Sequence, residues 1–168
     1  MADAAVQVLF VCLGNICRSP TAHGVFEAFV AQHGLQARIS VDSCGTGAWH
    51  VGESPDARAT AEAAGRGYDL SPLRARQFST DDFQHFDYIL AMDEQNLSDL
   101  EQLCPGQYPG HLGLFLGFAP GETRREVPDP YYGGASGFAD VLDLVEAASE
   151  RLLQHIIDSG RLGDAGRS

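Results

Sequence analysis

Lysine is absent from this chain of 168 residues, so all eleven of its basic residues are arginines. Long apolar runs are absent too, since none approaches the eighteen or so residues that a bilayer-spanning helix needs. The first residues carry no basic flank, and the apolar stretch Val6–Cys12 is too short and wrongly framed for a secretory signal peptide. We therefore expect no membrane association and a cytoplasmic location.

Cysteine is scarce and irregularly spaced. The chain has four cysteines and no C-x-x-C pair, which argues against a structural zinc site. Without a secretory signal, we expect these cysteines to be free thiols in a reducing compartment. The six histidines show no metal-ligand spacing either, so the sequence predicts no metal and no other cofactor.

Negative charge is in excess, with a formal net charge of −12 at pH 7. Such a charge argues against nucleic acid or an anionic membrane as a partner. It leaves room for a local phosphate site, because distant charges are screened beyond about 8–10 Å whereas backbone N–H groups and one arginine act at contact. The length and the 44% apolar content fit one globular domain, which we place at residues 1–160, followed by a disordered tail at 161–168.

Strand-like and helix-like segments alternate along the chain. The expected strands cover 6–11, 38–43, 86–92 and 112–118, and the expected helices run from 18 to the stop signal Gly34, over 55–64 with Ser54 as N-cap, over 94–103 and over about 136–158. This alternation predicts an α/β domain with a parallel sheet and right-handed crossovers. In such sheets, ligands bind beyond the carboxyl ends of the strands.

The segment from Cys12 to Ser19 connects the first expected strand to the first expected helix and reads C-L-G-N-I-C-R-S. A loop at a helix N-terminus presents free N–H groups to an anion, and Gly14 lets the backbone turn in and approach an oxygen closely. Arg18 supplies a planar fork for two phosphoryl oxygens. The same donors would keep Cys12 as a nucleophilic thiolate, and Ser19 can donate a hydrogen bond to its sulfur.

A C-x5-R match is weak evidence when taken alone, because chance gives roughly one such match in four chains with this many cysteines and arginines. The alternative for Cys12 is a buried thiol at the end of a strand, which is the usual fate of a lone cysteine. The presence of Gly14, Arg18 and Ser19 in register, between a strand and a helix, favours a phosphate loop.

A second motif, V-P-D-P-Y-Y at 127–132, supplies a candidate acid. Cleavage of an aryl phosphate through a cysteine needs a proton donor for the departing phenolate, and prolines on both sides of Asp129 could hold its carboxyl over the loop. Tyr131, Tyr132 and Trp49 could form an apolar slot for an aromatic ring. Taken separately, the motif is also compatible with an ordinary Pro-Asp turn, and each aromatic residue with simple packing.

Four segments can now be taken together: C-L-G-N-I-C-R-S at 12–19, D-S-C-G-T-G-A-W-H at 42–50, A-R-Q-F at 75–78 and D-P-Y-Y at 129–132. In this order and spacing the chain resembles the low-molecular-weight protein tyrosine phosphatases, from about Val6 to Ile157. The resemblance implies a three-layer α/β sandwich. Its four-stranded parallel sheet would have the order 2-1-3-4, with helices on both faces.

The same resemblance implies metal-independent hydrolysis of phosphotyrosine through a phosphocysteine. The nucleophile would be Cys12, the phosphate clamp Arg18, and the general acid and base Asp129. The other implied residues are Leu13, Gly14, Asn15, Ile16, Cys17 and Ser19 in the loop, Leu13, Trp49, Tyr131 and Tyr132 in the substrate pocket, and Asn15, Ser19 and Ser43 in the hydrogen-bond network that supports the loop. The implied partner is a phosphotyrosine-containing protein, with a bacterial tyrosine kinase as one candidate.

Leu73 and Cys44 depart from the family pattern, and Cys17 is a candidate for a redox role. Leu73 stands where many relatives have a histidine that supports the Asn15 network, so the tuning of the loop is in question. Cys44 stands where a small residue is usual, and we interpret it as a packing residue. Cys17 lies five residues from Cys12 on the same loop, and a disulfide between them could protect an oxidised nucleophile.

Other functions are compatible with such a loop. An arsenate reductase on a similar fold would need a closely spaced pair of further redox cysteines after the third strand, where only Cys104 is available. A phosphocarrier protein would have no use for an acid such as Asp129 that speeds hydrolysis. An inactive anion-binding module is disfavoured because Cys12, Arg18 and Asp129 are all present.

Overall fold

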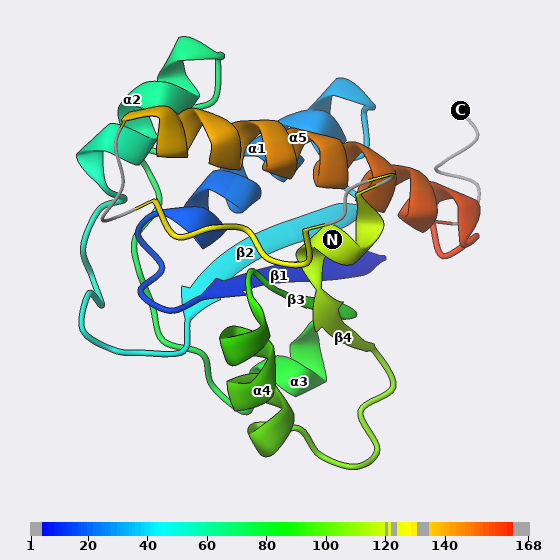
Figure 1. Cartoon of the computed structure of the whole chain (residues 1–168). Helices are drawn as coiled ribbons and strands as arrows, with labels where there is room; N and C mark the ends of the chain where they lie inside the picture. The colour runs from blue at the N-terminus through cyan, green and yellow to red at the C-terminus, as the bar shows by residue number, and fades with distance from the viewer. Residues whose placement is uncertain (1–4, 120, 122–123, 131–134, 163–168) are drawn as a thin grey trace.

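The computed structural model describes residues 5–119, 121, 124–130 and 135–162 and shows an α/β fold (Figure 1). Its strands are β1 (Val6–Cys12), β2 (Ile39–Gly45), β3 (Tyr88–Ala91) and β4 (His111–Leu114). Its helices are α1 (Arg18–Gln32), α2 (Ala57–Gly65), α3 (Asp82–His85), α4 (Glu94–Leu103), the 3₁₀ helix η1 (Phe115–Phe118) and α5 (Ala135–Asp158). The strands pair in parallel in the order β2-β1-β3-β4, which confirms the predicted fold class.

Strand β1 lies inside the sheet and is covered on both faces. Because side chains alternate along a strand, Val8 and Phe10 pack into the larger core, which includes residues of α1 and α5. Leu9 and Val11 point the other way, into a smaller core with residues of α3 and α4. All four side chains are fully buried. The nearly continuous apolar run of β1 is what a central parallel strand requires.

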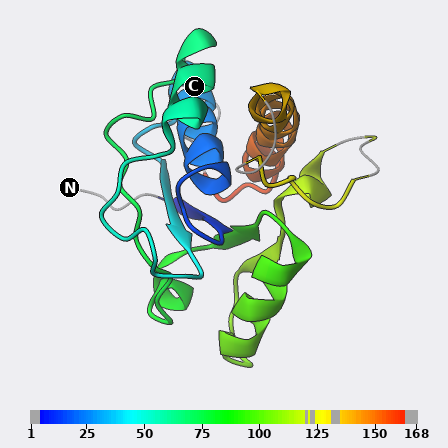
Figure 2. The same cartoon turned by 60° about the vertical axis from the view of Figure 1, so that its left-hand side comes forward.

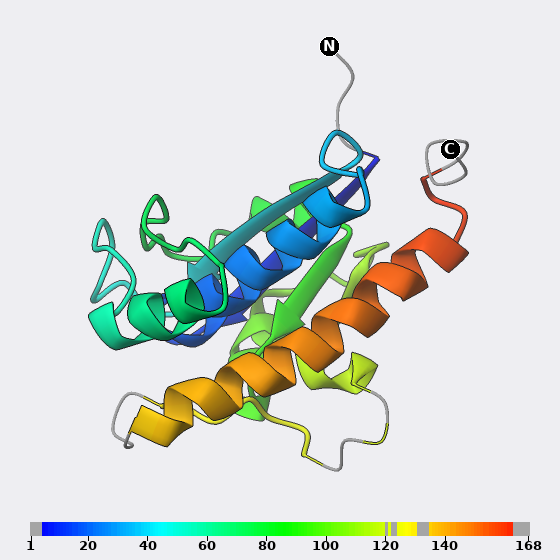
Figure 3. The same ribbon diagram turned by 90° about the horizontal axis from the view of Figure 1, so that it is seen from above.

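Helices α1 and α5 lie side by side over one face of the sheet, and α3 and α4 cover the other (Figure 2, Figure 3). The apolar stripe of α5 packs into the larger core, where Val141, Leu142, Val145, Leu152 and Ile156 are buried at helical spacing, whereas Phe138 is buried in a separate cluster with Cys17 and Ala59. With both faces covered, the carboxyl ends of the strands are left for a binding site.

Several expected boundaries are shifted by one or two residues, as in the third strand, which covers Tyr88–Ala91 rather than 86–92, and two further differences have a clear physical cause. The N-cap of α2 is Asp56 rather than Ser54, because the Asp56 carboxylate accepts hydrogen bonds from two backbone N–H groups in the first turn. The fourth strand ends at Leu114 instead of continuing to 118. The 3₁₀ helix that follows places the consecutive residues Phe115 and Leu116 together in the larger core, which a strand with alternating sides cannot do.

The first two residues of the expected disordered tail, Arg161 and Leu162, contact the domain. Arg161 forms an ion pair with Asp87 at 2.7 Å, and Leu162 is only 1% exposed. Both residues therefore lie against the domain, while the rest of the expected tail, 163–168, lies outside the described residues. Among the described helices, none is both long and apolar enough to cross a membrane.

Candidate active site

The expected phosphate loop lies at the carboxyl end of β1. The strand ends at Cys12, and the loop leads into α1, which begins at Arg18. The segment after β2 holds the loop, because the backbone N–H groups of Thr46 and Gly47 donate to the carbonyl oxygens of Cys12 (2.9 Å) and Leu13 (3.0 Å). The N-terminus of α1, with its unpaired N–H groups, is thereby fixed at the edge of the sheet.

Gly45, the last residue of β2, permits this close contact between the loop and the sheet. A Cβ atom at this position would lie 2.6 Å from the carbonyl oxygen of Leu13 and 3.2 Å from the backbone nitrogen of Asn15. Both atoms belong to the backbone, so a side chain at this position would push the loop away from the sheet. Gly45 is a residue whose role the sequence pattern did not reveal.

Asn15 is the residue of the loop with left-handed backbone geometry, at φ 57°. The turn therefore depends on an asparagine, which tolerates this conformation better than most residues, rather than on Gly14. The Asn15 side-chain amide donates to Ser19 Oγ at 2.8 Å. Its carbonyl oxygen accepts from the backbone N–H of Arg76 at 3.0 Å. The side chain thus ties the middle of the loop to α1 and to the segment before α3.

The sulfur of Cys12 is surrounded by polar groups of the loop and of α1. It lies 3.0 Å from Ser19 Oγ, and the backbone N–H of Asn15 donates to it at 3.2 Å. Cys12 is 3% exposed. Hydrogen-bond donors at these distances stabilise negative charge on the sulfur. The arrangement of Cys12, Asn15 and Ser19 therefore fits a nucleophile better than an inert packing thiol.

Arg18 is buried, and its guanidinium is held in one orientation. Its Nη1 donates to the Asp93 carboxylate at 2.7 Å and to the Val127 carbonyl oxygen at 3.1 Å. Its Nη2 lies 3.8 Å from the Asp129 carboxylate. Burial lowers the pKa of Arg18, but the negative groups of Cys12, Asp93 and Asp129 together outweigh burial, so that the pKa is raised. Arg18 is accordingly a fixed positive charge next to the sulfur.

Asp93 has a double role that the sequence pattern did not reveal. Its carboxylate accepts a hydrogen bond from the backbone N–H of Asn96 at 2.7 Å, and the Asn96 side chain accepts from the backbone N–H of Asp93 at 3.2 Å. This reciprocal pair is a capping box that starts α4. One sequence feature could have indicated that Asp93 belongs to the site: it is an acidic residue just after the third strand, and ligand-binding groups lie beyond the carboxyl ends of parallel strands.

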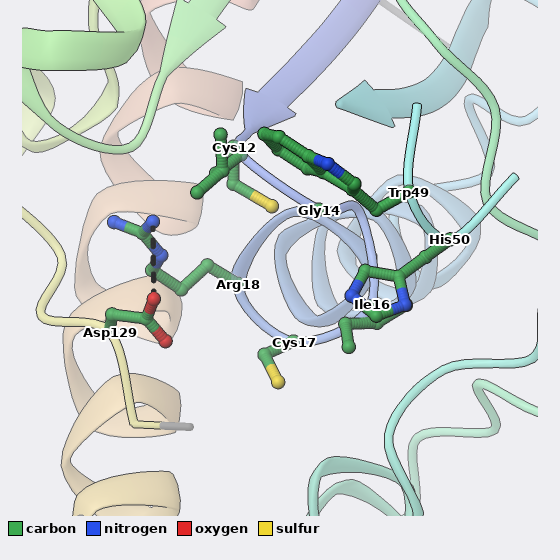
Figure 4. A pocket seen from close by; sticks show the side chains of 9 residues that line it. Cys12, Gly14, Ile16, Cys17, Arg18, Trp49, His50 and Asp129 are labelled. Atoms are coloured by element: carbon green, nitrogen blue, oxygen red, sulfur yellow. Dashed lines mark ion pairs between the residues drawn. The ribbon is translucent and has the colours of Figure 1, made fainter. Parts of the chain in front are cut away.

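A pocket of about 180 Å³ opens over the loop (Figure 4). Its lining consists of Cys12, Leu13, Gly14, Ile16, Cys17, Arg18, Trp49, His50 and Asp129. The three predicted catalytic residues therefore meet at one pocket, although Asp129 is far from the loop in sequence. Trp49, which is 73% exposed, forms part of the wall. The other two predicted pocket residues, Tyr131 and Tyr132, lie outside the described residues.

Comparison with known proteins identifies the class of protein to which this site belongs. The family model described as low molecular weight phosphotyrosine protein phosphatase matches residues 7–161. The chain belongs to this family. Within the described ranges of this phosphatase, no three His, Cys, Asp or Glu side chains gather in a way that could hold a metal ion.

Individual relatives agree with this assignment. The low molecular weight phosphotyrosine protein phosphatase of Schizosaccharomyces pombe is 46% identical over 152 residues, which cover 90% of this chain and 97% of the relative. A crystal structure of a protein tyrosine phosphatase from Entamoeba histolytica, with Hepes in its active site, superposes with a TM-score of 0.88 at 40% identity, covering 92% and 98% of the two chains. A Drosophila arginine phosphatase superposes with a TM-score of 0.84 at 34% identity, covering 90% and 98%.

Two residues singled out by the resemblance lie outside the loop of this phosphatase, and their side chains have the following partners. The hydroxyl of Ser43 lies 3.0 Å from Nδ1 of His23 on α1. Leu73 packs against the larger core. Cys44 is fully buried in the smaller core, as expected for a packing residue, and its carbonyl oxygen, 3.3 Å from Ser19 Oγ, is a second acceptor that the Ser19 hydroxyl can use in place of the Cys12 sulfur.

Cys17 differs from Cys12 although both lie in the loop. It is 5% exposed and packs with Ala59 and Phe138. Burial, followed by the negative charge of Asp56, raises the pKa of Cys17 to about 12. Figure 4 shows the Cys17 side chain directed away from Cys12. At neutral pH, Cys17 is therefore a protonated thiol.

Proposed function

We propose that this phosphatase hydrolyses phosphotyrosine in proteins through a phosphocysteine on Cys12, without a metal ion. The observation that carries the proposal is the meeting of Cys12, Arg18 and Asp129 at one pocket. The partner is a phosphotyrosine-containing protein, of which a bacterial tyrosine kinase is one candidate, and we expect the reaction to occur in the cytoplasm.

Binding of the phosphoryl group relies on the loop and on Arg18. The backbone N–H groups at the start of α1 and the positive end of its dipole stabilise an anion there. The Arg18 guanidinium can donate two parallel hydrogen bonds to phosphoryl oxygens, and its contacts with Asp93 and Val127 hold it in place before substrate arrives. Such preorganisation avoids a reorientation penalty during the reaction.

In the first step, the Cys12 thiolate attacks phosphorus. A sulfur–phosphorus bond forms, the bond from phosphorus to the tyrosyl oxygen breaks, and Asp129 gives its proton to the departing phenolate. The mechanism therefore requires Asp129 to act as an acid in this step and to carry the proton that the phenolate receives.

In the second step, Asp129 removes a proton from a water molecule, which attacks the phosphocysteine. The sulfur–phosphorus bond breaks, inorganic phosphate leaves, and Asp129 is again protonated for the next turnover. The Ser19 hydroxyl, 3.0 Å from the sulfur, can donate to the Cys12 thiolate as it leaves. The catalytic residues thereby return to their starting protonation states without any further reactant.

The pocket walls favour an aromatic leaving group. Leu13, Ile16 and Trp49 present apolar surface, which suits a phenyl ring. A guanidinium leaving group, as the name of the Drosophila arginine phosphatase implies for that protein, carries several N–H donors, for which Leu13, Ile16 and Trp49 offer no acceptor. Phosphoarginine is therefore the substrate against which phosphotyrosine should be compared.

Arsenate reduction is less well supported. Such chemistry needs a closely spaced pair of further redox cysteines after the third strand, whereas Cys44 lies before that strand and is fully buried in the smaller core. Cys104 lies just after α4, and no other cysteine lies near it in sequence. The match to the phosphatase family likewise favours hydrolysis.

Turnover of p-nitrophenyl phosphate in the presence of EDTA tests the proposal. We expect activity in the wild type, essentially none in Cys12→Ser, and a loss of order 10²–10⁴ in kcat for Asp129→Asn. Phosphotyrosine and phosphoarginine peptides should be assayed in parallel, and we expect the former to be preferred. Unchanged turnover by Cys12→Ser would exclude the mechanism, and a preference for phosphoarginine would exclude the proposed substrate.

A further inference from the structure

A second pocket, of about 250 Å³, adjoins the candidate active site. It shares two wall residues, Leu13 and Trp49, with the catalytic pocket. Asp99, Leu100 and Leu103 of α4 form another part of its wall. A chain that leaves the catalytic pocket across Leu13 and Trp49 therefore enters the second pocket.

Exposed apolar side chains gather at the second pocket, next to polar residues such as Thr46 and Gln77. Trp49, Leu103 and Leu13 are 73%, 51% and 43% exposed, and they are three of the four large hydrophobic side chains that are exposed among the described residues. Phe78 and Leu100, which are 9% and 0% exposed, line the same pocket from the protein interior. Clustering of exposed apolar side chains at one place is typical of a binding surface.

The charge at this pocket has one sign. Asp99 is the only ionisable residue in its described lining, where no basic residue occurs. The amide of Gln95 donates to one Asp99 oxygen at 3.0 Å and holds the carboxylate on the surface of α4. A ligand that fits both features has an apolar stem and a positively charged end. Such a cation can also lie over the exposed ring of Trp49.

We propose that this second pocket binds a lysine or arginine side chain of the substrate, within about three residues of the phosphotyrosine. We expect a short spacing because the two pockets share Leu13 and Trp49 as wall residues, and an extended peptide advances about 3.4 Å per residue. The proposal rests on the proposed function, because it assumes that the phosphotyrosine occupies the catalytic pocket. It adds a sequence preference that the catalytic pocket alone cannot provide.

A set of phosphotyrosine peptides tests the preference directly. Each of the three positions on either side of the phosphotyrosine is occupied in turn by arginine, alanine or glutamate, and kcat/KM is measured from released phosphate. We expect arginine to exceed alanine by about 3–10-fold at one or two positions, with glutamate below alanine, since an exposed ion pair and a cation–π contact are each modest. The preference should shrink at high ionic strength.

Variants of α4 locate the effect. Asp99→Asn should reduce the advantage of arginine over alanine, and Leu103→Ala should lower kcat/KM for the arginine peptide. Matched controls are Glu101→Gln, an exposed carboxylate on the same helix, and Val51→Ala, a 55% exposed hydrophobic residue; neither residue lines the two pockets. All four variants should retain wild-type turnover of p-nitrophenyl phosphate, which is too small to reach the second pocket.

The outcomes separate this inference from the proposed function. If the wild type hydrolyses p-nitrophenyl phosphate and all peptides but shows no preference for arginine over alanine at any position, only the inference about the second pocket is overturned. A preference for arginine that Asp99→Asn and Leu103→Ala leave unchanged would overturn it as well, because the preference would then arise elsewhere. Wild-type protein inactive towards both p-nitrophenyl phosphate and the peptides would instead overturn the proposed function.

Discussion

The Nη1 atom of Arg18 and the Oδ2 atom of Asp93 lie 2.7 Å apart, with side chains that are 5% and 21% exposed. The other carboxylate oxygen of Asp93 accepts from the backbone N–H of Asn96 and so caps α4. One side chain therefore links the orientation of the proposed phosphate clamp to the start of a helix. The two contributions can be separated, because only the first depends on charge.

Replacing Asp93 by asparagine should reduce catalysis more than stability. Asparagine is as good an N-cap as aspartate, but it lacks the charge that orients Arg18. We expect Asp93→Asn to lower kcat/KM for p-nitrophenyl phosphate by about 10–100-fold, since small misplacements of a positioning group have effects of this size. Urea unfolding should show that Asp93→Ala, which also loses the cap, is about 1 kcal/mol less stable than Asp93→Asn. Equal stability of the two variants would contradict a capping role.

The left-handed backbone of Asn15 provides a second test. Asn15→Gly keeps this conformation accessible but removes the hydrogen bonds to Ser19 and Arg76, whereas Asn15→Ala removes the same bonds and adds backbone strain. Both variants should lose activity, because the loop and Ser19 are no longer held. Asn15→Ala should unfold at lower urea concentration, by about 1–2 kcal/mol relative to Asn15→Gly. If the two variants have the same free energy of unfolding, position 15 carries no backbone strain in solution.

Gly45 should not tolerate any side chain. In Gly45→Ala the new Cβ atom would meet the Leu13 carbonyl oxygen, so the loop must shift and Cys12 with it. We expect kcat to fall and the free energy of unfolding to drop by about 1–3 kcal/mol. Gly65→Ala, at the end of α2 where a Cβ would meet nothing within 4 Å, is the control and should be neutral or stabilising. An active Gly45→Ala protein of wild-type stability would show that the loop can relax.

A disulfide between Cys12 and Cys17 stays a prediction. Hydrogen peroxide would oxidise Cys12 to the sulfenic acid, and attack by the Cys17 sulfur would then form the disulfide and release water. Because the pKa of Cys17 is about 12 and its side chain points away from Cys12, we expect the disulfide to form faster as pH rises from 7 to 9. After peroxide treatment and then a thiol reductant, activity should return in the wild type and stay lost in Cys17→Ser. Mass mapping of both proteins should find the Cys12–Cys17 disulfide only in the wild type. Cys12 found only as sulfinic or sulfonic acid in the wild type would argue against protection.

The parts of the molecule that could be predicted from sequence are those encoded locally. The apolar run of β1 and the loop after it are each contained in fewer than ten residues, so their residue types alone indicate a buried strand and an anion site. The role of Asp93 could not be predicted in this way. It depends on a contact with Arg18, which is 75 positions away in sequence, and on the parallel pairing of β1 with β3.

Gly45 and the second pocket show the same limit. Position 45 needs a glycine because β2 pairs with β1. This pairing brings the Leu13 carbonyl oxygen to 2.6 Å from the position that a Cβ atom of residue 45 would occupy. Leu103 lies three residues after Leu100 on α4, which is the spacing of one helix face, yet it is 51% exposed and lines the same pocket as Trp49. Apolar periodicity identifies a helix face, but it does not show whether the last turn of that face is covered.

Stability at alkaline pH should depend on Tyr68. Burial, together with the hydrogen bond from its hydroxyl to Glu146 at 2.6 Å, raises the pKa of Tyr68 to about 12 from an ordinary value of 10.0. The folded state therefore keeps this proton between pH 10 and 12 while the unfolded state loses it. The contribution is fully present below pH 10 and disappears as pH rises through 12.

Tyr68→Phe should consequently be less stable than the wild type at pH 9 by about 1 kcal/mol, because the hydrogen bond is gone. Its free energy of unfolding should also decline less steeply between pH 10 and 11.5, since the variant has no proton to lose at this position. Urea unfolding at half-unit pH intervals measures both effects. Cys17, whose pKa is also raised, contributes equally to both proteins and cancels in the comparison. If the free energies of unfolding of the two proteins decline in parallel above pH 10, the Tyr68 hydroxyl has the same pKa in the folded and unfolded states.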